Sequence, residues 1–285
     1  MARVSRPALG FADGRSLANA LARRHVNSVV MRIDRGVEVE LPCTSDLASE
    51  ALKGDFEVAH RRALHCLIDP GQCAIDVGAN VGLMTCAMAS SVGPHGKVIA
   101  VEPLPSCLRF LQRNIERNSF ASRIESVPAC ASDSEGPIDV CVIPGREEYS
   151  SVSTIVHEAA AGQVSHVRVS GVTIDGIVRR LGCSPSLIKV DTEGHEARVL
   201  EGAKRTLADH RPVLSLELVP RLLAAHGSSF EALDGHLRSA GFGLLTMDGT
   251  PLQAWMIGKR RFAQLLAVPE ERRTECIDRL RSTRT

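Results

Sequence analysis

Aromatic side chains and an excess of charge of either sign are both missing from this sequence. Phe, Trp and Tyr make up 3% of the 285 residues, and 34 basic residues face 33 acidic ones, for a net charge of +1. Proteins that hold single-stranded nucleic acid stack bases on exposed aromatic side chains, and polyanion-binding surfaces are rich in Lys and Arg. The composition therefore indicates that nucleic acid is not a partner.

Long hydrophobic runs and paired cysteines are missing as well. No run reaches the ~18 apolar residues of a membrane span, and no apolar stretch of about 7–15 residues follows the N-terminus, as it would in a secretory signal. The nine cysteines are scattered and form no C-x-x-C pair, a pattern typical of free thiols in a reducing compartment rather than of zinc ligands. We expect a cytoplasmic protein without stable membrane insertion, and the sequence does not determine its oligomeric state.

The most informative stretch is 73–84, which reads CAIDVGANVGLM. A short apolar run, a loop of small residues and a helical pattern predict the strand–turn–helix opening of a nucleotide-binding α/β domain. The dinucleotide fingerprint G-x-G-x-x-G is absent, because Gly78 and Gly82 flank Asn80 instead. The carboxylate of Asp76 would repel a pyrophosphate and attract a cation. The loop therefore favours S-adenosylmethionine, which has no phosphate and carries a cationic amino acid end and a sulfonium.

Two later acids complete the expected cofactor site. Glu102 follows the predicted strand 97–101, where an acid is placed to accept both ribose hydroxyls. Asp133 follows the third strand and is expected at the adenine amino group, with a plain turn aspartate as the equal alternative. For Asp76 the competing interpretation is an acid that caps the following helix, and for Glu102 it is a surface acid. The predicted cofactor-binding residues are Asp76, Gly78, Ala79, Asn80, Gly82, Glu102 and Asp133.

A second stretch, 187–196, runs from an apolar strand into three acids and a histidine. Ligands of an open doubly wound sheet bind at the carboxyl ends of its strands, so these residues should lie beside the cofactor. Methyl transfer to an alcohol is helped by a general base, for which Asp191 is the first candidate and Glu193 the second. His195 is a third, unless it only caps or packs at a helix start. A divalent metal on Asp191, Glu193 and Glu217 is an alternative that we do not expect.

Both stretches carry a family resemblance. DVGANVG at 76–82, followed by IKVDTEGHE at 188–196, resembles the FkbM-type S-adenosylmethionine-dependent methyltransferases, and VLEGA at 199–203 and GDFE at 54–57 are also similar. The resemblance covers about residues 50–250. It implies a Rossmann-like class I methyltransferase fold and O-methylation of a small-molecule or glycan hydroxyl, on a sugar, glycolipid or natural product. A nucleic-acid or protein methyltransferase and a non-catalytic cofactor-binding module are the alternatives.

The order of predicted elements divides the chain into three parts. Residues 1–69 form an N-terminal extension with a β-hairpin and a helix. Residues 70–258 form the methyltransferase domain, whose β-α-β-α-β pattern predicts a mostly parallel doubly wound sheet. A β-rich insertion follows strand three over 130–175, and the last strand is expected over 252–257. Residues 259–285 form a basic tail, expected to be a solvated helix.

Some polar residues have ordinary explanations. Glu57 is expected on the solvated side of the helix ahead of the first strand. Ser150 and Ser151 lie in a polar loop of the predicted insertion, where a role in binding hydroxyls and simple loop solubility explain them equally well.

Overall fold

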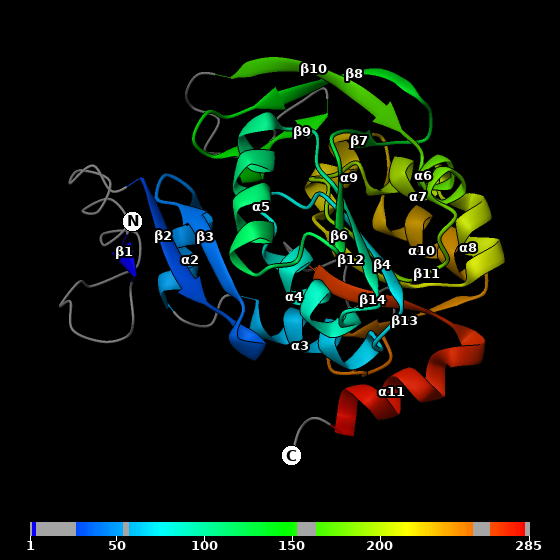
Figure 1. The fold of residues 1–285 in the computed structure, drawn as a ribbon. Coiled ribbons are helices and arrows are strands. Elements are labelled where there is room, and N and C mark those ends of the chain that lie inside the picture. Colours follow the sequence, from blue (N-terminus) through cyan, green and yellow to red (C-terminus); the bar gives the residue numbers. More distant parts are fainter. Residues whose placement is uncertain (1, 4–26, 54–56, 153–163, 253–262, 283–285) are drawn as a thin grey trace.

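Seven strands form the central sheet of the computed structural model, which describes residues 2–3, 27–53, 57–152, 164–252 and 263–282 (Figure 1). The strand order is β13-β14-β12-β11-β4-β5-β6, and neighbours are parallel except in the two pairs that include β14. The strands are β4 (Cys73–Val77), β5 (Lys97–Val101), β6 (Ile124–Val127), β11 (Pro185–Val190), β12 (Val213–Leu218), β13 (Phe242–Thr246) and β14 (Ala263–Pro269).

Helices cover both faces of this sheet. In β4, Ala74 packs in one hydrophobic cluster, whereas Ile75 and Val77 pack in the other. Successive side chains of a strand point to opposite faces, so a strand covered on both sides is apolar along its length, as is usual in parallel sheets. One layer contains α3 (Val58–Leu67), α4 (Leu83–Val92), α5 (Pro105–Arg117) and α11 (Arg273–Ser282), and the other α6 (Ile174–Leu181), α7 (Glu196–Glu201), α8 (Lys204–His210), α9 (Pro220–Ala225) and α10 (Phe230–Ser239).

The strand order reverses at β4. From β4 the chain continues outward through β5 and β6, and it then returns to the other side of β4 to form β11 and β12. In the β4–β11 pair, Asp76 is in register with Lys189 and Val77 with Val190. The loops that follow these two strands therefore start side by side, at the switch point where open α/β sheets bind ligands.

The expected insertion after strand three forms a second sheet. It has four strands in the order β7-β10-β8-β9, and it lies across one end of the central sheet (Figure 1). Val140 and Val142 pack against Leu104 and Cys107 at the start of α5, which attaches the sheet to the main domain. Its strands are β7 (Cys130–Ala131), β8 (Gly136–Val142), β9 (Ser151–Val152) and β10 (Ser165–Val172), and the 3-10 turn η2 (Glu147–Tyr149) precedes β9.

The expected N-terminal hairpin forms a sheet of its own. Strands β2 (Ser28–Arg32) and β3 (Glu38–Pro42) pair across the turn η1 (Asp34–Gly36), and β1 (Ala2–Arg3) lies beside β2. Asn114 of α5 fixes the hairpin: its Oδ1 accepts from the Glu40 amide at 2.6 Å, and its Nδ2 donates to the Glu40 carbonyl at 3.0 Å. Helix α2 (Asp46–Lys53) then leads toward α3.

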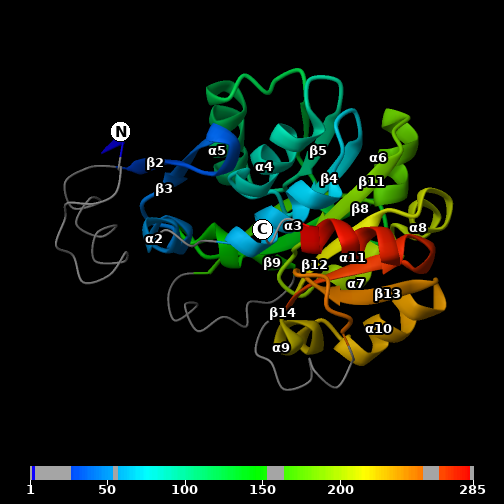
Figure 2. The ribbon, with the colours of Figure 1, turned by 90° about the horizontal axis from the view of Figure 1, so that it is seen from below.

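The central sheet continues past the expected end of the domain at residue 258. The sheet is completed by β14, which lies between β12 and β13, and α11 packs on α3 (Figure 2). A solvated helix was expected here, but Cys276 and Leu280 of α11 are buried, so one side of this helix packs against the rest of the protein. Residues 253–257 of the strand expected over 252–257 lie outside the described residues. Within the described part of the chain, every helix is too short or too polar to span a bilayer.

Candidate active site

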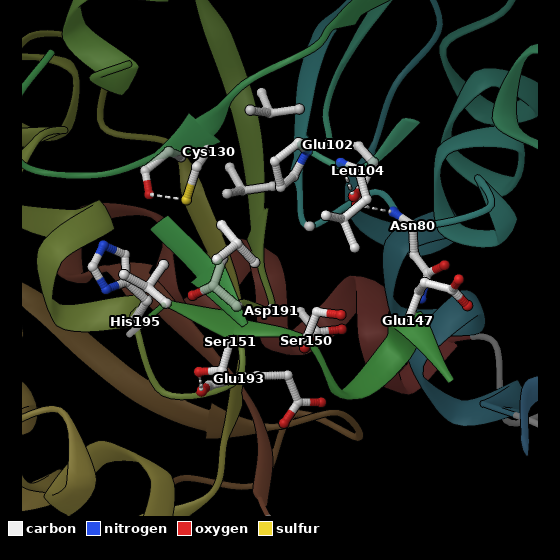
Figure 3. A pocket seen from close by; sticks show the side chains of 18 of the residues that line it. Asn80, Glu102, Leu104, Cys130, Glu147, Ser150, Ser151, Asp191, Glu193 and His195 are labelled. Atoms are coloured by element: carbon white, nitrogen blue, oxygen red, sulfur yellow. Dashed lines mark hydrogen bonds between the residues drawn. The ribbon is translucent and has the colours of Figure 1, made fainter. Parts of the chain in front are cut away.

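A pocket opens at the carboxyl ends of β4, β5 and β11, beneath the second sheet. It contains about 650 Å³ of empty space, counting the part open to solvent, and its walls come from both sheets and from η2. Figure 3 shows Asn80 and Glu102 on one side of the pocket and His195 on the other, with Asp191 between them.

The loop after β4 contributes mainly backbone. Gly78 and Asn80 line the pocket, and both have left-handed backbone, with φ of 73° and 51°. A Cβ on Gly78 would lie 1.9 Å from the carbonyl oxygen of Asp191, so the two loops approach as closely as glycine permits. Ala79 and Gly82 are not among the lining residues: the Ala79 amide donates to the Val101 carbonyl at 3.1 Å, and a Cβ on Gly82 would meet Leu111 of α5 at 2.5 Å.

Glu102 lines the pocket, as the ribose-binding prediction requires. Its carboxylate accepts hydrogen bonds from the amides of Asn80 at 2.8 Å and Leu104 at 2.9 Å, which hold it against the first loop. The side chain is almost fully buried, and burial raises the pKa of Glu102 to about 7 against the lowering effect of these hydrogen bonds. Its contact with ribose stays a prediction.

Asp76 is not among the residues that line the pocket, and the expected contact between its carboxylate and a cationic cofactor stays a prediction. It is completely buried; Thr85 Oγ1 donates to Oδ2 at 2.6 Å, and Lys189 Nζ lies 3.2 Å from Oδ1. The alternation of β4 turns this side chain toward α4, beside its register partner on β11. The cation that Asp76 attracts is therefore a lysine of the protein itself.

Asp133 also lies outside the pocket lining. It forms an ion pair with Arg198 and accepts a hydrogen bond from Ser134 at 3.1 Å. The hydrogen bond from Arg198 lowers the pKa of Asp133. The alternative of a turn aspartate describes its position better than a contact with adenine.

The loop after β11 supplies the acids of the pocket. Asp191 lines it with 28% of its side chain exposed, and its Oδ2 lies 3.3 Å from Lys189 Nζ. Burial raises the pKa of Asp191, Lys189 opposes this effect, and Glu57 adds to it. Glu193, at a left-handed φ of 52°, lines the same wall. Burial and the charge of Asp191 raise the pKa of Glu193 to about 8.

His195 lines the pocket but is also a packing residue. It is 7% exposed at the start of α7, and its Nε2 lies 3.0 Å from Ser132 Oγ. Burial lowers the pKa of His195 to about 4, and the neighbouring His226 adds to this effect. The imidazole is therefore neutral near pH 7. The loop itself is closed by Glu196, whose Oε1 accepts from the amides of Thr192 and Gly194 at 3.0 and 3.1 Å.

A family model described as the methyltransferase FkbM domain matches residues 76–244. The chain belongs to the FkbM methyltransferase family. Its curated relatives include methyltransferase sdnD of Sordaria araneosa, 28% identical over 153 residues, or 45% of this chain and 59% of that protein. Protein-L-isoaspartate O-methyltransferase 2 of Arabidopsis thaliana is 24% identical over 166 residues, or 54% of this chain and 51% of that protein. The chain thus spans little more than half the length of these two relatives.

A solved structure of methyltransferase FkbM from Methylobacillus flagellatus is similar to this chain, with a TM-score of 0.46 and 18% identity, and the match covers 72% of this chain and 49% of that one. Membership of the FkbM family, together with the strand order, confirms the predicted Rossmann-like class I methyltransferase fold with its N-terminal hairpin. The division into three parts and the roles of the site residues stay predictions.

Two further acids of this FkbM-family chain lie near Asp191: Glu217 was predicted there as an alternative metal ligand, whereas Glu57 was not predicted near the site. Glu57 is only 22% exposed, rather than solvated as expected, and His60 Nδ1 lies 3.5 Å from its Oε2. Gln264 of β14 connects it to Glu217, with Nε2 at 3.4 Å from Glu57 Oε1 and 3.3 Å from Glu217 Oε2. Burial, with the charges of Asp191 and Glu57, raises the pKa of Glu217 to about 9. The GDFE resemblance was the only signal for Glu57.

The second sheet and η2 add further polar groups. Glu147, Ser150 and Ser151 line the pocket (Figure 3), and so does Glu148. Ser151 Oγ donates to the Glu193 carbonyl at 2.9 Å and lies 2.9 Å from His226 Nε2, so it is part of the framework. Ser150 Oγ, in contrast, is buried and has no hydrogen-bond partner among the described residues. A buried hydroxyl without a partner is costly, which makes Ser150 a candidate ligand contact.

The residues present fit the cofactor that the family implies. The backbone of Gly78 and Asn80 leaves room beside Glu102, and Leu104, Val101 and Ala131 add an apolar wall. Acids and an unpartnered hydroxyl face the remaining space, which suits a ligand with two cationic groups. Among the described residues, no three His, Cys, Asp or Glu side chains are arranged to hold a metal ion.

Proposed function

We propose that this protein transfers a methyl group from S-adenosylmethionine to a hydroxyl group of a sugar, glycolipid or natural product. One observation supports the proposal above the others. The described residues that line the pocket include five acids but no Lys or Arg: Glu102, Glu147, Glu148, Asp191 and Glu193. Such a lining offers carboxyl groups to a cationic methyl donor and no cationic side chain to a phosphate-bearing nucleotide.

Each side of the pocket then has its own role. Gly78, Asn80 and Glu102 bind and orient the cofactor, which supplies an electrophilic methyl group for in-line displacement. Asp191 accepts the hydroxyl proton as the oxygen attacks, since its carboxylate is part exposed in the pocket. Glu193 is the second base on the same wall, and His195 orients this wall through its bond to Ser132.

The acidic lining also bears on the methyl acceptor. A carboxylate acceptor, such as the isoaspartate named in several relatives, would enter a pocket that already holds several carboxylates, and the phosphates of a nucleic acid would meet the same repulsion. A neutral hydroxyl avoids this cost, and Ser150 Oγ offers it a hydrogen-bonding partner. This favours sugars and natural products over protein carboxylates and RNA.

Cofactor binding is the first test. S-Adenosylmethionine should raise the melting temperature in proportion to ln(1 + [L]/Kd), whereas NAD should not. Transfer of labelled methyl is then measured on a panel of neutral glycosides and polyols, an isoaspartyl peptide and an RNA. We expect label only on neutral hydroxyl compounds. Stabilisation by NAD alone would overturn the cofactor assignment, and label on the peptide or RNA would overturn the acceptor class.

Asp191→Asn separates an enzyme from a binding module. Replacing a general base typically costs about 10²–10⁴-fold in rate, so we expect a loss of transfer in this range while the Kd for S-adenosylmethionine changes by less than about fivefold. Asp133→Asn is the matched control, because this acid lies outside the pocket. Full transfer by Asp191→Asn would remove Asp191 from the base role.

A further inference from the structure

The ammonium group of Lys189 joins the two loops of the site. This residue lies near the carboxyl end of β11 and is 3% exposed. Its Nζ donates to the Gly78 carbonyl at 3.3 Å and forms ion pairs with Asp76 Oδ1 at 3.2 Å and Asp191 Oδ2 at 3.3 Å. One partner thus belongs to the loop after β4, one to β4 itself and one to the loop after β11.

These contacts exceed what charge balance requires. A buried lysine is tolerated when one carboxylate neutralises it, and Asp76, its register partner, already does so. An ammonium group has three donors, and here three acceptors surround it. The contacts with Gly78 and Asp191 therefore fix both loops relative to one rigid strand. Among the described residues, Lys189 is also the one cationic side chain that forms an ion pair with Asp191.

We propose that Lys189 is a positioning residue, whose charge holds Asp191 Oδ2 and the Gly78 carbonyl in place and so keeps the Asp191 carboxylate beside the point at which the methyl group is transferred to the hydroxyl. This inference rests on the proposed function. In this role Lys189 is the counter-ion of Asp191 and at the same time contacts the cofactor loop at Gly78. The ammonium group itself lies between the carboxylates of Asp76 and Asp191.

The variants must separate positioning from simple charge balance. Lys189→Met alone would leave Asp76 and Asp191 buried without a counter-ion, which is strongly destabilising. We therefore use the Asp76→Asn background, in which Lys189 keeps its contacts with Asp191 and with the Gly78 carbonyl. The double variant Asp76→Asn/Lys189→Met then removes the ammonium without leaving Asp76 charged. In the same background, Lys189→Gln keeps a neutral donor and provides a second, more conservative test if the Met variant does not fold.

The measurement needs no known acceptor. Sinefungin carries an amine where S-adenosylmethionine carries its methyl group, whereas S-adenosylhomocysteine has nothing there. The ratio of their dissociation constants, measured by calorimetry at pH 7.5, reports whether a charged carboxylate lies next to the position of this amine. A charge-assisted hydrogen bond is worth about tenfold or more in affinity, so we expect the wild type and Asp76→Asn to prefer sinefungin by at least this factor.

In the double variant we expect this preference to fall at least fivefold, toward the value of Asp191→Asn. Lys189→Gln should give an intermediate preference. An unchanged or increased preference in a folded double variant would overturn the inference, since Lys189 would then only balance charge. If the wild type binds neither compound, the proposed function fails instead, and the two failures are thereby distinguished.

Discussion

The loops after β4 and β11 meet at one pocket, but the first contributes mainly backbone and the second mainly acidic side chains. The first is shaped by its backbone: Gly78 and Asn80 have left-handed conformations, and Asp76 is turned inward to Lys189. The second presents acids to the pocket: burial and the charge of Glu57 raise the pKa of Asp191, and burial and the charge of Asp191 raise the pKa of Glu193. The comparison indicates that shape governs the cofactor side of the site and charge governs the acceptor side.

The largest effect should come from adding one methyl group to the first loop. In Gly78→Ala the new Cβ would lie 1.9 Å from the Asp191 carbonyl oxygen at a φ of 73°. Because all the atoms that this Cβ would meet belong to the backbone of Asp191, which cannot rotate away, we expect a loss of more than about 2 kcal/mol in the free energy of unfolding and no measurable binding of S-adenosylmethionine. Chemical denaturation and calorimetry test this.

The matched control is Gly235→Ala in α10, where no atom lies within 4 Å of the added Cβ. This change should stabilise the protein by about 0.4–1 kcal/mol, since alanine restricts the unfolded chain. If both variants bound the cofactor equally well, the first loop would not depend on its shape, and the contrast between the two loops would be lost.

The fold was largely predictable because its signals are local. The stretches 73–84 and 187–196 each contain most or all of a strand, a loop and a helix start, and a mostly parallel sheet follows from the alternation of strands with helices. The position of β14 was not predicted, since it depends on antiparallel pairing with β12 and β13, strands that precede it in the sequence. Periodicity alone does not report such pairing.

The site was predictable to the level of its loops but not of every side chain. Glu102, Asp191 and Glu193 line the pocket because they directly follow strand ends. Asp76 and Asp133 also lie near strand ends but are occupied by Lys189 and Arg198, partners that the fold brings from distant positions. A short motif identifies the acid and not its partner, which is why the structure does not support these two expectations.

The charge of the second loop predicts how stability depends on pH. The pKa of Glu193 is raised from 4.5 to about 8, so the folded protein keeps a proton that the unfolded chain has already released between these values. The free energy of unfolding should therefore fall as the pH rises from 5 to 8. In Glu193→Gln, which is neutral throughout, the fall should be smaller. Urea denaturation at the two pH values measures the difference.

Glu201→Gln is the control for this experiment, because Glu201 lies exposed at the end of α7 and pairs with Lys204. It should show the same fall as the wild type. If Glu193→Gln also followed the wild type, the acids of the second loop would not repel one another, and charge would not distinguish this loop from the first.

The smallest effect should come from Asp133→Asn, which tests the border of the site. This change removes the ion pair with Arg198, whose side chain is 60% exposed, and such surface pairs contribute about 0–1 kcal/mol. The Kd for S-adenosylmethionine should stay within about twofold of the wild-type value, because Asp133 does not line the pocket. Calorimetry with adenosine as a second ligand sharpens the test. A tenfold weakening of both would place Asp133 at the adenine after all and extend the cofactor side of the pocket beyond the loop after β4.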